Sequence, residues 1–144
     1  MAGRLYFRAP AVCAVASFAF VLCMVTPVFR ILDYAEALAF YIEWLGFRID
    51  WADRPAGAPA YLQVARADVV LHLSGHPTDG APGSLARAEV QSLATYHHQL
   101  LRQPHPFAPP VLARAEWNPR VLEMTVIDPF GNRIVFCEPA GLSG

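Results

Sequence analysis

Five histidines are the side chains of this chain best suited to chemistry, but their spacing does not assemble a catalytic centre. They are His72, His76, His97, His98 and His105. His97 and His98 are adjacent on a predicted helix and point about 100° apart, so we expect them at the surface. His76 and His105 each precede a proline in a loop, and His72 lies in a predicted strand. The sequence contains no Ser/His/Asp spacing, phosphate-binding loop or dinucleotide fingerprint.

Aromatic and acidic side chains form a second group with chemical potential. Trp51 lies between Asp50 and Asp53, and Trp117 follows Glu116 in a polar segment. A tryptophan beside charged residues can stack on a flat ligand, and carboxylates attract a cationic one. The predicted ligand-binding residues are Trp117, Trp51, Asp50, Asp53, Glu116 and Tyr61. Phe130 could line the same cleft, although strand periodicity does not say which face Tyr61 and Phe130 occupy.

The composition indicates one globular domain without an electrostatic footprint for nucleic acid. Of 144 residues, 55% are hydrophobic and 16% charged, and the formal net charge is −1, which suits a single core. All basic residues are arginines, and they are scattered, so we expect no nucleic-acid partner. Cys137 stands alone in an apolar strand, where we expect a buried, unreactive side chain without a basic neighbour. The other cysteines, Cys13 and Cys23, give no disulfide framework.

The first half of the chain predicts a strand, a helix and three further strands. A short apolar strand covers 28–31, and Asp33 with Glu36 three residues later fits a capping box. The apolar stripe of the helix consists of Leu38, Tyr41, Ile42 and Leu45. Gly46 then ends the helix as a left-handed C-cap, and Trp44 beside it is predicted to pack in the core. Strands are predicted at 47–51, 61–65 and 69–74.

The second half repeats this order more faintly after a linker rich in proline and glycine at 76–84. Ser92 is predicted to cap a helix that runs to about Leu101. Strands are predicted at 87–90, near Phe107, at 122–127 and at 134–138. The sequence therefore predicts an α+β fold of two tandem βαβββ modules, about 24–80 and 81–144, whose curled mixed sheets surround a cleft.

Two segments carry a resemblance to a known family: Thr26–Phe47, TPVFRILDYAEALAFYIEWLGF, and Asp128–Glu138, DPFGNRIVFCE. Over about residues 24–139 the chain resembles the glyoxalase/bleomycin-resistance/extradiol-dioxygenase (vicinal oxygen chelate) superfamily, and within it the bleomycin-resistance proteins most closely. The resemblance implies a homodimer whose clefts are completed by both chains, and stoichiometric capture of a cationic, aromatic, bleomycin-like antibiotic without catalysis or cofactor. It also implies that Trp117 stacks on the drug's flat bithiazole. The second stacking aromatic of those proteins falls where this chain has Ala56 and Gly57.

The alternative is a metal-dependent lyase or dioxygenase of the same superfamily. The resemblance implies ligand positions near Thr26, His72, Leu85 and Val135, of which only His72 could ligate. One imidazole cannot build an octahedral or facial-triad site. A slipped alignment could promote Glu89 or Glu138, but a slip of one residue turns a strand side chain to the opposite face. We therefore predict no metal ligand. A third hypothesis, a structural or signalling module, requires a cleft filled by the protein's own side chains.

Residues 1–23 differ from the rest of the chain, with two arginines and no acidic residue. The apolar run of roughly 15 residues from Ala11 to Val25 suits a signal peptide and is short for a membrane-spanning helix. Two further explanations are an upstream start codon, with Met24 as the natural start, and an integral element of the core. We favour the upstream start. We thus expect a cytoplasmic protein without stable membrane association, or an exported one if residues 1–23 are a genuine leader.

Overall fold

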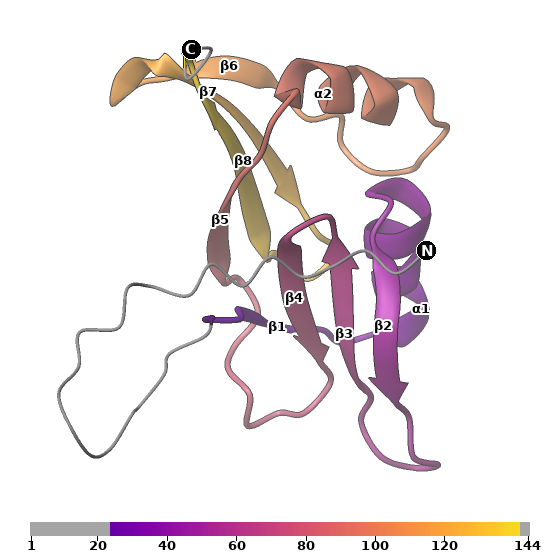
Figure 1. The fold of residues 1–144 in the computed structure, drawn as a ribbon. Coiled ribbons are helices and arrows are strands. Elements are labelled where there is room, and N and C mark those ends of the chain that lie inside the picture. The colour runs from indigo at the N-terminus through magenta and orange to yellow at the C-terminus, as the bar shows by residue number, and fades with distance from the viewer. Residues whose placement is uncertain (1–23, 142–144) are drawn as a thin grey trace, which may run out of the picture.

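The computed structural model describes residues 24–141, so the predicted N-terminal extension lies outside the described residues. The first module contains β1 (Val28–Arg30), α1 (Tyr34–Leu38), the π-helix η1 (Ala39–Trp44), β2 (Arg48–Asp53), β3 (Tyr61–Arg66) and β4 (Val69–Ser74). The second contains β5 (Leu85–Glu89), α2 (Leu93–Arg102), β6 (Leu112–Ala115), β7 (Asn118–Ile127) and β8 (Arg133–Pro139). The predicted fold class, two tandem βαβββ modules with mixed sheets, is confirmed (Figure 1).

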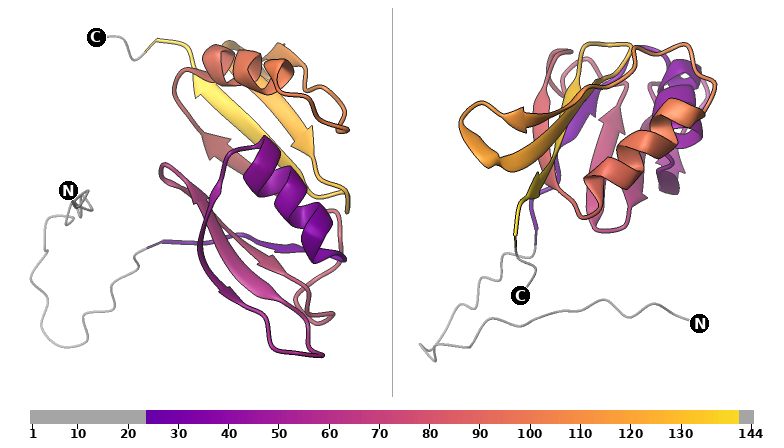
Figure 2. Two further views of the ribbon diagram at one scale, coloured as in Figure 1. Left: turned by 90° about the vertical axis from the view of Figure 1, so that its right-hand side faces the viewer. Right: turned by 90° about the horizontal axis from the view of Figure 1, so that it is seen from above.

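Each module contributes one open sheet of four strands. Sheet A has the order β1-β4-β3-β2 and sheet B the order β5-β8-β7-β6. The first strand of each module runs parallel to the last, and the other neighbours are antiparallel. The two modules follow one another along the long dimension of the molecule, each with its own helix (Figure 2). Within residues 24–141, none of the helices has the length and apolar character needed to cross a membrane.

One hydrophobic core joins the helix-covered faces of both sheets. Alternate residues of each central strand point into it, as the period of a strand requires. From sheet A these are Leu62, Val64, Leu71 and Leu73, and from sheet B Met124, Val126, Ile134 and Phe136. The intervening residues point to the opposite face, which we call the outer face of each sheet. No helix of residues 24–141 covers either outer face.

The first helix begins as predicted but widens into a π-helix. Asp33 caps it by accepting a hydrogen bond from the Glu36 backbone at 2.8 Å, and the Leu45 backbone NH donates to the Phe40 carbonyl, five residues earlier, at 2.9 Å. This wider turn brings Phe40, Tyr41, Trp44 and Leu45 into the core. The predicted packing role of Trp44 is confirmed, and so is the C-cap at Gly46, with φ +77°.

Two expectations for the second module are wrong. The predicted strand near Phe107 is a loop, and Phe107 instead packs edge-on against Phe40 at 5.0 Å between ring centroids. Ser92 does not cap α2 with its side chain. The Glu138 carboxylate does so in its place, accepting hydrogen bonds from the Ser92 and Leu93 backbone NH groups at 2.7 and 3.0 Å. A carboxylate at this position also complements the positive end of the helix dipole.

Several side-chain hydrogen bonds join the modules, among them those of the Tyr96 and Tyr41 hydroxyls. The Tyr96 hydroxyl on α2 donates to the Leu45 carbonyl at the end of η1, at 2.8 Å, and the Arg66 guanidinium donates to the same carbonyl and lies 4.2 Å from the centre of the Tyr96 ring. The Tyr41 hydroxyl donates to the buried Asp128 carboxylate at 2.7 Å. Burial raises the pKa of Tyr96 to about 12 and that of Tyr41 well above its ordinary value.

Candidate functional site

The outer face of sheet A collects aromatic and polar side chains from three adjacent strands. Trp51 on β2 pairs with Gln63 on β3, which pairs with His72 on β4, so the three residues share one face. A β-bulge between Ile49 and Trp51 makes Asp50 the extra residue of β2. Asp50 also reaches the outer face, because it hydrogen-bonds the Gln63 side chain there.

An aromatic pair forms the centre of this face. The Trp51 and Tyr61 rings stack with 5.8 Å between their centroids and 6° between their planes. The His72 ring meets both rings edge-on at 5.3 Å, and the Tyr61 hydroxyl lies 2.8 Å from His72 Nδ1. Trp51 is 44% exposed, so a flat apolar surface remains open to solvent beside these polar groups. The sequence could not show this contact, because it depends on the bulge.

The two predicted carboxylates on β2 differ in their surroundings. Asp50 forms an ion pair with Arg48, whose Nε lies 2.9 Å from its Oδ1. Asp53 is exposed and lies across from Tyr61, with no ion pair or side-chain hydrogen bond to any other described residue. Partial burial and the negative charge of Asp79 raise the pKa of Tyr61, so its hydroxyl keeps its proton. Asp53 is therefore the carboxylate available to a ligand.

The second group lies on sheet B. Glu116 and Trp117 are the two turn residues of the β6–β7 hairpin, and Trp117 is 65% exposed. The Trp117 Nε1 donates to Glu123 at 3.0 Å, while Arg87 pairs with Glu123 and lies 5.6 Å from the centre of the Trp117 ring. The hydrogen bond from Arg87 lowers the pKa of Glu123. Sequence reasoning missed Arg87 and Glu123, although strand alternation places both on the outer face.

The structure does not bring all predicted ligand-binding residues together within one chain. Asp50, Trp51, Asp53 and Tyr61 lie on sheet A, whereas Glu116 and Trp117 lie at the far hairpin of sheet B (Figure 1). A cavity of about 480 Å³ lies between the modules, lined by residues such as Arg66, Glu89 and Tyr96. None of the predicted ligand-binding residues lines it.

The observed strand register differs from the metal-ligand positions that the resemblance implied. Val28 rather than Thr26 lies opposite His72, and Arg87 rather than Leu85 lies opposite Val135. Neither Val28 nor Arg87 is a metal ligand. Across residues 24–141, no three His, Cys, Asp or Glu side chains gather as a metal site would require. Glu138 caps α2, and both ring nitrogens of His72 have hydrogen-bond partners.

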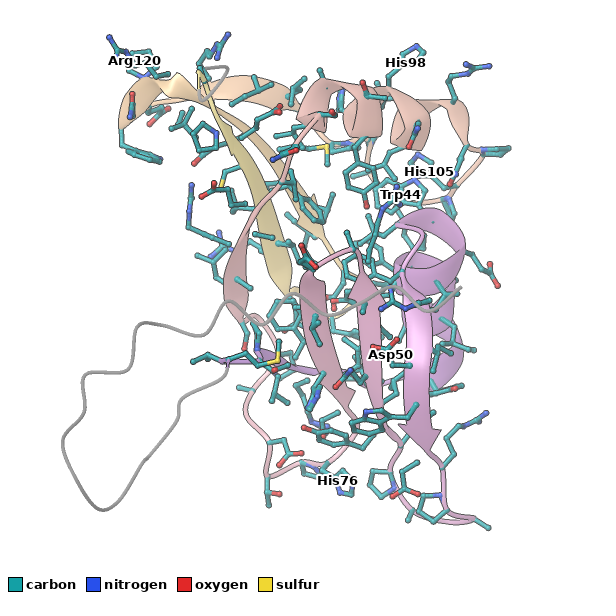
Figure 3. The ribbon with its side chains drawn as sticks, viewed as in Figure 1. Trp44, Asp50, His76, His98, His105 and Arg120 are labelled. Carbon is teal, nitrogen blue, oxygen red and sulfur yellow. The ribbon has the colours of Figure 1, made fainter. Side chains whose placement is uncertain are left out.

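Of the remaining histidines, His97 and His105 make contacts within the scaffold. The His105 ring is tilted against Trp44, with 4.4 Å between ring centroids (Figure 3). His97 lies 2.8 Å from the Pro110 carbonyl and is half-buried rather than at the surface. His98 is exposed as expected, whereas His76 lies near Tyr61 at the end of sheet A (Figure 3).

The positions of Cys137 and Phe130 also differ from the expectations stated for them. Cys137 is half-buried rather than buried, and it has a basic neighbour in Arg87. The expectation failed because β5, which carries Arg87, pairs with β8. Phe130 packs against the hydrophobic core rather than lining either group.

The two modules and their mixed sheets agree with one protein family. A family model described as "Glyoxalase superfamily protein" matches residues 13–141. The chain belongs to the glyoxalase superfamily. No curated protein matches this sequence.

Solved structures with the same fold as this glyoxalase superfamily member include bleomycin-binding and bleomycin-resistance proteins. The bleomycin-binding protein from bleomycin-producing Streptomyces verticillus, complexed with copper(II)-bleomycin, is 26% identical, with a TM-score of 0.62 over 85% of this chain and 98% of that one. The bleomycin resistance determinant encoded on transposon Tn5 is 21% identical, with a TM-score of 0.60 over 82% and 98%. A putative glyoxalase family protein from Bacillus anthracis is 19% identical, with a TM-score of 0.56 over 83% and 98%.

Proposed function

We propose that this protein binds a bleomycin-type antibiotic and protects its cell by stoichiometric sequestration, without catalysis. The observation that carries the proposal is the similarity to the Streptomyces verticillus protein complexed with copper(II)-bleomycin, which spans 98% of that chain. The mechanism needs no base, nucleophile or cofactor, since a drug held in a protein cleft cannot reach DNA. We place this activity in the cytoplasm, where the drug's target lies.

The outer face of sheet A supports the proposal through its chemistry. The exposed Trp51, backed by Tyr61, offers a flat surface for an aromatic plane, and stacked aromatic pairs contribute about 0.5–1.5 kcal/mol beyond the area they bury. Asp53 lies across from Tyr61 and adds a negative charge that attracts a cationic group. The hairpin of sheet B adds a second exposed tryptophan, Trp117, with Glu116 beside it.

We further propose a homodimer in which the outer face of sheet A of one chain meets the outer face of sheet B of its partner. Two features support this arrangement. Trp51 and Trp117 lie on separate sheets of one chain, so a second copy can bring the two groups into one cleft. Leu85 and Ile127, on the outer face of sheet B, are more than half exposed, and burying such side chains favours association.

Titration calorimetry of metal-free and copper(II)-loaded bleomycin into the full chain tests the binding proposal. We expect one site per chain, and an affinity at least about tenfold weaker in Trp51→Ala and in Trp117→Ala. Leu101→Ala, which removes an exposed apolar side chain from α2, is the matched control and should bind as the unaltered chain does. Absence of binding to either form of the drug would refute the proposal.

The same sample decides the alternative of a metal-dependent enzyme. Elemental analysis should find divalent metal far below one equivalent per chain, because Val28, Arg87 and Val135 occupy the positions around which a ligand set would have to form. A stoichiometric metal that is lost in His72→Ala would instead support the enzyme.

A further inference from the structure

A row of four polar side chains crosses the outer face of sheet A. The Tyr61 hydroxyl oxygen, Oη, lies 2.8 Å from His72 Nδ1, and His72 Nε2 lies 3.0 Å from Gln63 Oε1. The Gln63 Nε2 donates in turn to Asp50 Oδ2 at 2.8 Å. The row thus runs from β3 to β4, back to β3 and on to β2, and its His72 ring meets the exposed ring of Trp51 edge-on.

The carboxylate at the end of the row fixes the direction of every hydrogen bond in it. An ionised Asp50 can only accept, so the Gln63 amide must present its NH₂ group to Asp50 and its carbonyl oxygen to His72. That oxygen can only accept, so His72 must carry a hydrogen on Nε2. In a neutral imidazole Nδ1 then holds the lone pair, and the Tyr61 hydroxyl must donate to it.

This direction determines what Tyr61 and Trp51 present to solvent. The hydroxyl hydrogen of Tyr61 is committed to His72, so its oxygen offers only lone pairs to a ligand. His72 restrains the Tyr61 ring through the hydroxyl and meets the edges of both aromatic rings, while Tyr61 supports Trp51 by parallel stacking. Tyr61 Oη and the carboxylate of Asp53, two polar groups beside the stacked rings, are therefore acceptors.

We propose that His72 is a positioning residue: held in its Nε2–H tautomer by Gln63 and Asp50, it locks Trp51 and Tyr61 into a preformed platform for a planar ligand group that carries a hydrogen-bond donor or positive charge. The statement about the ligand rests on the proposed function, whereas the tautomer and the locked pair do not. A platform fixed before binding loses less side-chain entropy when the ligand arrives. His72 thereby acts on recognition without touching the ligand.

The tautomer can be measured without any ligand. In a long-range ¹H–¹⁵N spectrum of the labelled full chain, we expect the His72 ring to carry its hydrogen on Nε2 alone, with His72→Asn identifying its signals. Gln63→Leu removes the acceptor that holds this hydrogen, so its spectrum should show exchange between the two tautomers. An Nδ1–H tautomer, or the same averaged signal in the unaltered chain and in Gln63→Leu, would overturn the proposal.

Two substitutions at His72 separate positioning from simple packing. Asn places an acceptor close to the position of Nδ1, whereas Leu removes both polar atoms at similar size. We expect His72→Asn to keep the near-ultraviolet circular dichroism of the stacked pair and to bind copper(II)-bleomycin within about threefold of the unaltered chain. His72→Leu should lose the signal that Trp51→Phe also removes, and should bind about tenfold more weakly.

The outcomes distinguish this proposal from the proposed function. If the unaltered chain binds no bleomycin, the drug assignment fails, and the spectrum together with the dichroism still decides the role of His72. If His72→Leu keeps both the dichroism and the affinity, the positioning role is refuted. Equal losses in His72→Asn and His72→Leu would refute it as well. Tyr61→Phe, which removes only the hydroxyl, provides the same test should His72→Leu fold poorly.

Discussion

Trp51 and Trp117 are both exposed, but different interactions hold them. Trp51 rests on another ring, and its indole nitrogen makes no hydrogen bond to the other described residues, whereas Trp117 is held at its edge by Glu123 and has Arg87 over its ring. The sequence predicted both tryptophans as candidates from their charged neighbours. It could not predict their partners, because Tyr61, Arg87 and Glu123 reach them only through strand pairing.

A single hydroxyl links the first helix to the turn before the last strand. Tyr41 donates to Asp128, whose carboxylate also accepts from the Asn132 backbone and side chain. A hydrogen bond to a buried carboxylate contributes about 1.5–3 kcal/mol. We therefore expect Tyr41→Phe to lower the free energy of unfolding by that amount in urea denaturation. Tyr34→Phe is the control, because the Tyr34 hydroxyl has no hydrogen bond to the other described residues; equal losses would contradict the assignment.

At the scale of elements, α2 depends on a cap from a distant strand. Glu138 on β8 receives the first NH groups of the helix, while the Ser92 side chain makes no capping bond. Glu138→Ala should thus cost about 1–2 kcal/mol of unfolding free energy. Ser92→Ala should change it by less than about 0.5 kcal/mol. Thermal unfolding followed by far-ultraviolet circular dichroism measures both changes. A larger loss in Ser92→Ala than in Glu138→Ala would support the Ser92 cap predicted from the sequence.

The C-terminus of η1 requires glycine for two reasons. Gly46 has φ +77°, and a Cβ there would collide with the Arg66 guanidinium that crosses it. Gly57 has φ +72° in an exposed loop, where an added Cβ would meet no other atom within 4 Å. Gly57→Ala therefore measures backbone strain alone, about 1–2 kcal/mol, and Gly46→Ala should cost more by urea unfolding. Equal costs would mean that Arg66 moves aside freely.

The order of elements could be predicted from the sequence because each signal is local. The Asp33 cap, the Gly46 stop and the strand alternation all act within a few residues. The π-helix could not be predicted, since spacings of three, four and five residues overlap over a single turn. The strand expected near Phe107 does not form. Phe107 lies among prolines, and its position is set by apolar contact with Phe40, which is distant in the sequence and cannot be predicted from local patterns.

For the whole molecule, the contact between Tyr96 and the Leu45 carbonyl makes the junction of the modules sensitive to alkali. Burial raises the pKa of Tyr96 from 10.0 to about 12, although Arg66 lowers it. The unfolded chain releases this proton near pH 10, so the stabilisation is complete below about pH 10 and is lost as pH rises through about 12. We expect the urea unfolding free energy to fall over this window, and to fall less in Tyr96→Phe. A fall of the same slope in Tyr96→Phe would assign it to other groups, among them Tyr41.

The bulge in β2 has a consequence for how this surface could have arisen. Asp50 is the extra residue between Ile49 and Trp51, which pair with the consecutive residues Val64 and Gln63. The gain or loss of one codon here adds or removes the Asp50 carboxylate, while every other residue pair between β2 and β3 keeps its register. The scaffold can therefore acquire or discard the end of the hydrogen-bonded row in one evolutionary step, without a compensating change in the core.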